Sequence, residues 1–168
     1  LIYLKTARSK ISPKALAKLT CLPHLCTFSL SHLGREAATI LNKLQSSNKV
    51  LNELEISDSP IHKAELAVLV SIPSLKTLVL RNTQTTAKDL EALQHYRGSL
   101  KVLNCTVEPE ASAEILTQMP LAYVQLGNKK WNDETNSKVL NILAKRFTRR
   151  CCSIEVETGA ENPALYRE

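Results

Sequence analysis

Glycine and aromatic residues are scarce in this sequence. The four glycines, Gly34, Gly98, Gly127 and Gly159, stand singly, which excludes a glycine-rich loop of the kind that cradles phosphates or dinucleotides. Aromatic side chains make up only 4% of the 168 residues, so the core has to be mainly aliphatic. No apolar run approaches the roughly 20 residues that a membrane-spanning helix needs, and the first residues lack a signal-peptide pattern. We therefore expect no membrane span.

The cysteines are few and irregularly spaced. None forms a C-x-x-C pair, and no histidine follows at zinc-finger spacing. A chain of this length buries enough surface to fold without disulfide bonds. We expect reduced thiols, no metal site and no cofactor, in the cytoplasm or in a host cytosol into which the protein is delivered. The five residues are Cys21, Cys26, Cys105, Cys151 and Cys152.

The net charge of +6 is distributed in blocks. Basic residues dominate positions 1–50 and 129–150, whereas the middle of the chain carries an acidic excess. The basic segment 145–150 follows an expected helix, whose C-terminal end attracts cations. Contact with nucleic acid or an anionic surface is the alternative, but the segment lacks interleaved exposed aromatic residues. Nucleic acid is therefore the less favoured partner.

Leucine, in contrast, is abundant, at 27 of 168 residues, and it recurs in a pattern. The pattern L-x-x-L-x-L, with substitutions, repeats every 21 to 30 residues. In the fifth copy we place it on Leu100, Leu103 and Cys105. The copies start at Leu1, Leu25, Leu51, Leu75, Leu100 and Leu121, and a degenerate seventh copy starts at Cys151.

Each copy predicts one short strand and one helix. Alternation in L-x-L places two apolar side chains on one side of a strand. A second apolar set lies further along at helical spacing, as at Leu66 and Leu69 or at Leu90 and Leu93. Neither element can bury its apolar side alone, so neighbouring units have to stack. The expected fold class is α/β with a parallel sheet.

This repeat resembles the leucine-rich repeat family. The resemblance covers residues 1–158 and implies a curved solenoid, with the parallel sheet on the concave face and the helices on the convex face. A helix over about 133–148 is expected to close the stack, and residues 159–168 to form a mobile tail. Because nothing covers the first strand, we expect a missing portion ahead of Leu1.

The resemblance also implies which residues meet a partner. In this family the non-leucine positions of the strands, and those just after them, face the concave side. Here they combine an acidic centre, basic and amide positions beside it, and aromatic or apolar anchors of the kind that binding hot spots use. The predicted set is Tyr3, Lys5, Arg8, Thr27, His32, Glu53, Glu55, Asp58, Lys76, Val79, Arg81, Asn82, Val102, Asn104, Tyr123, Gln125 and Asn128.

We therefore expect a protein-binding module and not an enzyme. Cys26, His32 and Asp58 could be imagined as a catalytic triad, but an open face with few glycines offers no sheltered oxyanion site. The partner could be an enzyme that the chain inhibits or regulates, as a bacterial effector or an effector regulator does. Two alternatives stay open, namely an F-box type substrate receptor of a ubiquitin ligase, and nucleic-acid or anionic-surface binding by the basic flanks.

Overall fold

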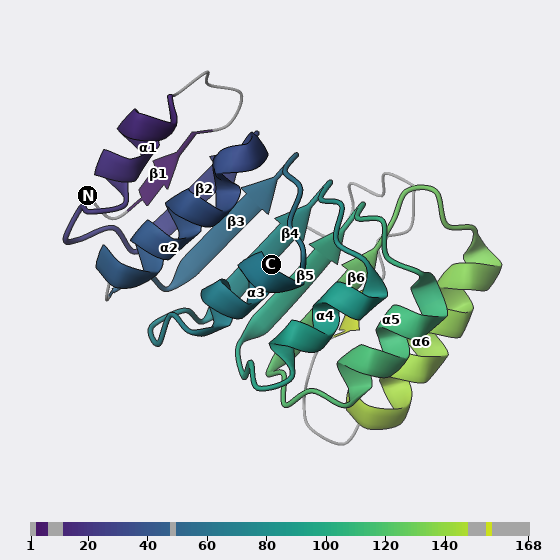
Figure 1. Ribbon diagram of the computed structural model, residues 1–168. Helices are drawn as coiled ribbons and strands as arrows, with labels where there is room; N and C mark the ends of the chain where they lie inside the picture. The colour runs from purple at the N-terminus through teal and green to yellow at the C-terminus, as the bar shows by residue number, and fades with distance from the viewer. Residues whose placement is uncertain (1–2, 7–11, 48–49, 148–153, 156–168) are drawn as a thin grey trace, which may run out of the picture.

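Strands and helices alternate along the chain, so the predicted α/β class is confirmed (Figure 1). The computed structural model describes residues 3–6, 12–47, 50–147 and 154–155. The strands are β1 (Tyr3–Lys5), β2 (Thr27–Ser31), β3 (Glu53–Ser57), β4 (Thr77–Arg81), β5 (Ser99–Leu103), β6 (Tyr123–Gly127) and β7 (Ile154–Glu155). The helices are α1 (Pro13–Leu19), α2 (Ala37–Ser47), α3 (Lys63–Val70), α4 (Ala87–Leu90), α5 (Pro109–Thr117) and α6 (Asp133–Phe147), with 3-10 turns η1 (Gly34–Glu36) and η2 (Glu91–Leu93).

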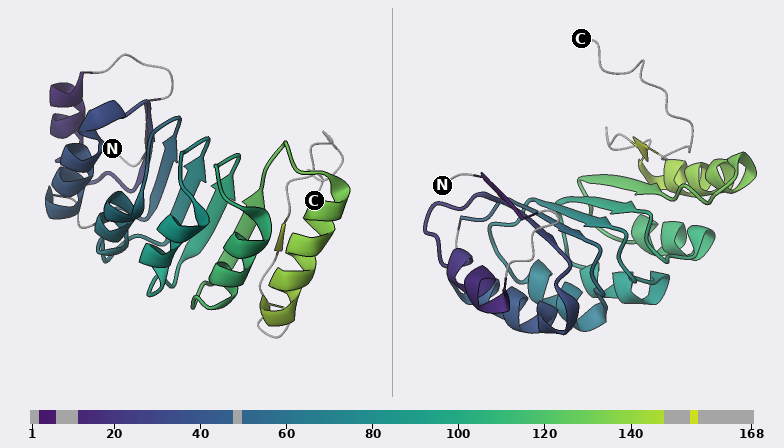
Figure 2. Two further views of the ribbon diagram at one scale, coloured as in Figure 1. Left: turned by 45° about the vertical axis from the view of Figure 1, so that its right-hand side comes forward. Right: turned by 90° about the horizontal axis from the view of Figure 1, so that it is seen from above.

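The seven strands form one sheet in the order of the chain, and every neighbouring pair is parallel. All the helices lie on one side of this sheet (Figure 1). Seen from above, the helices follow the outer side of an arc and the strands its inner side (Figure 2). We call the side of the sheet turned away from the helices the open face.

The core lies between the sheet and the helices. In β3, Leu54 and Ile56 have no exposed surface, whereas Glu53, on the opposite side of the strand, is exposed. One row of core side chains crosses five adjacent strands in register and contains only one aromatic ring. Its members are Phe28, Leu54, Leu78, Leu100 and Val124. In the described part of the chain, no helix is long and apolar enough to cross a membrane.

The fifth strand departs from the predicted register. Leu100 pairs with Leu78, and Val102 pairs with Leu80, so the frame that began the fifth copy at Leu100 was wrong by three residues. The connection before β5 is short because α4 gives way to the 3-10 turn η2. A 3-10 turn rises about 2.0 Å per residue against about 1.5 Å in an α-helix, so fewer residues cover the same length. Cys105 consequently lies beyond β5, in the turn that follows.

Four successive strands are each followed directly by a residue in the left-handed backbone region. These residues are His32, Asp58, Asn82 and Asn104, with φ angles of 56°, 50°, 51° and 54°. Histidine, aspartate and asparagine adopt this region more readily than most residues. Each backbone N–H donates to the carbonyl oxygen of the last residue of the next strand, at 2.8 to 3.2 Å. The left-handed residue therefore extends the sheet pairing by one step while it turns the chain away.

Acidic side chains link the helices of neighbouring units. The first N–H group of α3, on Lys63, donates to Asp89 Oδ1 of α4 at 2.9 Å. The first N–H group of α4, on Ala87, donates to Glu108 Oε2 just before α5 at 3.0 Å. N–H groups at the start of a helix have no acceptor within it and carry partial positive charge. A carboxylate of the following unit satisfies this requirement.

Asp89 holds this link in its charged form. Burial by itself raises the pKa of Asp89, but the N–H and hydroxyl of Thr86, at 2.9 and 2.8 Å, and the Lys63 N–H donate to the carboxylate. His62 lies 3.7 Å away and adds a further attraction. Together these interactions lower the pKa of Asp89 below its ordinary value of 3.8.

Replacing Asp89 by Asn should lower the free energy of unfolding by about 1 kcal/mol at neutral pH, because a charged acceptor is lost at the start of α3. A lowered folded pKa gives a contribution that is complete above 3.8 and is lost as the pH falls through the folded value. The difference between wild type and Asp89→Asn should therefore shrink in acid. Urea unfolding at several pH values measures it, with Glu114→Gln on α5 as the control. A difference that does not depend on pH would contradict the assignment.

Candidate functional site

The open face presents three rows of side chains that the register brings into line. The first row is Tyr3, Thr27, Glu53, Thr77, Ser99 and Tyr123. The second is Lys5, Ser29, Glu55, Val79, Lys101 and Gln125, and the third is Ser31, Ser57, Arg81, Leu103 and Gly127. Since helices cover only the other side, this face can carry charged side chains such as Lys5 and Glu53 that remain exposed to water.

Most of the predicted binding residues lie on this face or at its edge. Those on the face are Tyr3, Lys5, Thr27, Glu53, Glu55, Val79, Arg81, Tyr123 and Gln125. Those at the edge follow the ends of their strands and are His32, Asp58, Asn82, Asn104 and Asn128. The register thus places in one row side chains that are up to 120 positions apart in the sequence, with Tyr3 at one end of the row and Tyr123 at the other.

Two of the predicted residues lie elsewhere, and one lies outside the described residues. Val102 has no exposed surface and points into the core, because it pairs with Leu80. The predicted register of β5 was wrong here. Lys76 precedes β4 and is out of phase with Thr77 and the rest of the open face; it lines a pocket at the N-terminal edge of the sheet. Arg8 is the residue outside the described ranges. Val79 does lie on the open face, but only 8% of its surface is exposed.

The predicted set also omits three residues of β5 that do lie on the open face. Ser99 and Lys101 are half-buried, and Leu103, which lies in the third row between Arg81 and Gly127, is buried. The ammonium of Lys101 lies 5.8 Å from the centre of the Tyr123 ring, within reach of a cation–π interaction. The alternation of polar Ser99 and Lys101 with apolar neighbours was the sequence signal that could have found them.

Two acidic residues of β3 share the open face but differ in their surroundings. Glu55 accepts a hydrogen bond from Ser29 Oγ at 3.1 Å and pairs with Arg81 Nε at 3.5 Å. It therefore ties β2, β3 and β4 together. The side chain of Glu53 is exposed, and its carboxylate forms no hydrogen bond or ion pair with any described residue. Of the two β3 carboxylates, Glu53 is thus the one that is available to a ligand.

The polar groups at the C-terminal edge are mostly engaged in the turns. Asn82 Nδ2 donates to Asp58 Oδ1 at 3.1 Å, and Asn104 Oδ1 accepts from the Lys129 N–H at 2.9 Å. Asn128 Nδ2 donates to the carbonyl oxygen of Cys105 at 2.9 Å. These side chains hold successive turns to one another. They border the open face and, being engaged in these hydrogen bonds, add little binding surface to it.

The described cysteines are free thiols in three different settings. Cys21 is exposed, Cys26 is half-buried and Cys105 is buried. Burial raises the pKa of Cys105 in spite of its hydrogen bonds to Thr83 and Leu103. Cys105 consequently stays a protonated thiol that packs between turns. Within the described ranges, no three His, Cys, Asp or Glu side chains gather as a metal site would require.

Comparison with known proteins adds no relative. No protein-family model matches the chain, and no curated protein matches it significantly.

Glu55→Ala and Arg81→Ala should each lower the free energy of unfolding by about 0.5 kcal/mol, because both side chains are partly solvated and a surface ion pair contributes little. Glu53→Ala should leave stability unchanged, since its carboxylate has no partner among the described residues. Urea unfolding of the three variants and of the Glu55/Arg81 double variant measures the coupling. Equal effects of Glu53→Ala and Glu55→Ala would show that Glu55 is not a link between strands.

Proposed function

We propose that the chain is a leucine-rich repeat solenoid that binds a partner protein through its open face. Three features support the solenoid: strands that follow one another in the order of the chain, helices on one side only, and aliphatic side chains in register across the sheet. Such an architecture leaves a broad sheet surface uncovered. Uncovered repeat surfaces of this kind are used to bind extended partners.

The observation that carries the proposal is the first row of the open face. Tyr3, with 55% of its surface exposed, lies at one end, the unpartnered Glu53 lies in the middle, and Tyr123 lies at the other end. Five strand spacings of about 4.8 Å make this row about 24 Å long. That length suits a protein interface of ordinary size. Tyrosine is also enriched among the residues that dominate binding energy.

The charge pattern states what the partner should present. Glu53 favours a cationic group of the partner opposite the middle of the row, whereas Lys101 on β5 favours an acidic group nearby; Arg81 on β4 is already paired with Glu55. Opposite charges arranged in this order would fix the register of the partner and speed its association. The tyrosines at the two ends would supply most of the apolar contact.

If the open face covers the functional surface of its partner, the chain acts as an inhibitor or regulator. We favour a partner enzyme, in the manner of a bacterial effector or an effector regulator. A substrate receptor of a ubiquitin ligase would use the same face, so the identity of the captured protein distinguishes the two roles.

Affinity capture from nuclease-treated lysates of the source cell and of a host cell tests the proposal. Glu53→Lys and Tyr3→Ala should each weaken capture of the bound protein about tenfold, because hot-spot substitutions cost that much. The matched controls, Glu114→Lys on α5 and Leu140→Ala on α6, carry the same types of change on exposed helix positions and should leave capture unchanged. Binding isotherms with the identified protein then give the ratios.

Capture that survives both open-face substitutions would refute the proposed binding face. Recovery of material only when nuclease is omitted, with a steep loss as salt rises, would point instead to nucleic-acid binding by the basic flanks.

A further inference from the structure

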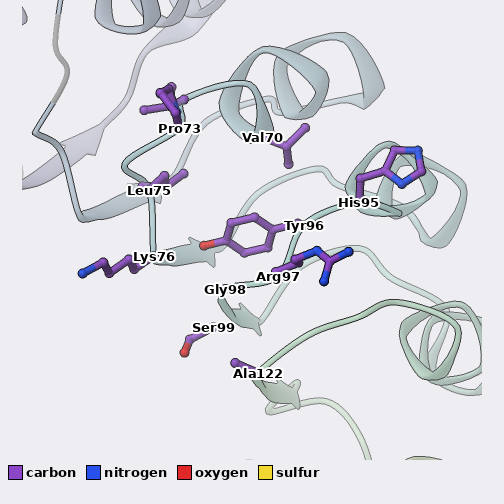
Figure 3. Close-up of a pocket in the computed structure, with 11 residues that line it drawn as sticks. Val70, Pro73, Leu75, Lys76, His95, Tyr96, Arg97, Gly98, Ser99 and Ala122 are labelled. Carbon is purple, nitrogen blue, oxygen red and sulfur yellow. The ribbon is translucent and has the colours of Figure 1, made fainter.

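A pocket of about 490 Å³ opens at the N-terminal edge of the sheet, where Ser99 is the one lining residue that also belongs to the open face (Figure 3). One wall is the connection from α3 to β4, and another is the connection from η2 to β5. Ala122, just before β6, closes a third side. The volume is within the range of small-molecule sites.

The pocket exists because the fifth unit lacks a leucine that its neighbours have. Two positions before the first strand residue, the second, third, fourth and sixth units carry a buried leucine, whereas the fifth unit carries the exposed Arg97. An arginine cannot fill the core space that a leucine fills. The four leucines are Leu25, Leu51, Leu75 and Leu121, with 0%, 0%, 7% and 4% of their surfaces exposed.

Tyr96 takes over part of that space and forms an aromatic wall of the pocket. Only 5% of its surface is exposed, and its ring lies in the middle of the lining residues (Figure 3). Gly98 permits this placement, because a side chain there would collide with the Lys76 carbonyl oxygen and the Tyr96 hydroxyl. That hydroxyl has no hydrogen-bond partner among the described residues, and burial raises the pKa of Tyr96. The ring therefore stays neutral.

Every side chain of the lining that can carry a charge is basic. These are Lys76, His95 and Arg97, and no carboxylate faces them within the lining. Neither Lys76 nor Arg97 forms an ion pair with any other described residue. The Arg97 and His95 side chains project to one side of the Tyr96 ring, and the Lys76 side chain extends to the other (Figure 3). An anion is therefore favoured on the side of Arg97.

We propose that this pocket binds a small organic carboxylate with an apolar body. The guanidinium of Arg97 would hold the carboxylate through two parallel hydrogen bonds, the geometry that arginine favours. The imidazole of His95 lies on the same side and would offer a further polar contact. The apolar body would pack against the Tyr96 ring and the aliphatic residues Val70, Ile72, Pro73 and Leu75.

Titration of the ¹⁵N-labelled full chain with 4-phenylbutyrate, followed by NMR, tests this site. Saturable shifts are expected at the backbone amides of Gly98, Ser99 and Ala122. The neutral amide 4-phenylbutyramide has the same apolar body and should bind at least about tenfold more weakly, because it cannot form the charged pair. Arg97→Leu, which restores the repeat pattern, should abolish binding while leaving the thermal midpoint unchanged or higher. Arg35→Gln in η1 is the matched control and should retain binding.

Three results would overturn the proposal: no saturable shift in the wild-type chain, equal affinity for the acid and the amide, or unchanged binding by Arg97→Leu. If Arg97→Leu does not fold, Arg97→Gln takes its place, and retained binding by that variant has the same meaning.

Discussion

The shared row of aliphatic side chains between the sheet and the helices is the constraint on which the rest of the structure depends. A strand of five residues and one short helix cannot bury their apolar sides alone, so each unit is held by its neighbours. A slip of one residue would turn Leu54 and Ile56 out of the core. Packing on the covered side therefore dictates the order of the charged groups on the open face.

The same constraint explains how far the sequence predicts the fold. In the units around β1 to β4 and β6, the spacing of leucines leaves one frame that fills the core, and the predicted register agrees with the pairing of the strands. The fifth unit offers two frames. The frame Leu100, Leu103 and Cys105 has more matches to the pattern than Arg97, Leu100 and Val102, yet only the second aligns with β4 and β6. Counting matches to the pattern within the fifth unit favours the first frame. Pairing with β4 and β6 selects the second.

Outside the fifth unit, most members of the open face were predictable from the sequence, but their contacts with one another were not. Glu53 and Glu55 are two residues apart on one strand and have the same side-chain chemistry. Their difference arises from Ser29 and Arg81, which belong to neighbouring strands and reach only Glu55. The pocket at Arg97 was hidden for a related reason, because a missing leucine becomes visible only when the units are correctly superimposed. In both cases the decisive partner lies about one unit away in the sequence.

The order of the strands has a consequence for how the chain can change in length. Each strand in the described ranges pairs only with its predecessor and its successor in the sequence. Loop closure therefore costs about the same entropy at every step, and no step has to await a distant part of the chain. A whole strand and helix can be inserted or deleted between two units while every other pairing is preserved. The length of the open face can thus change by whole units, while the other units keep the side chains that they present on it.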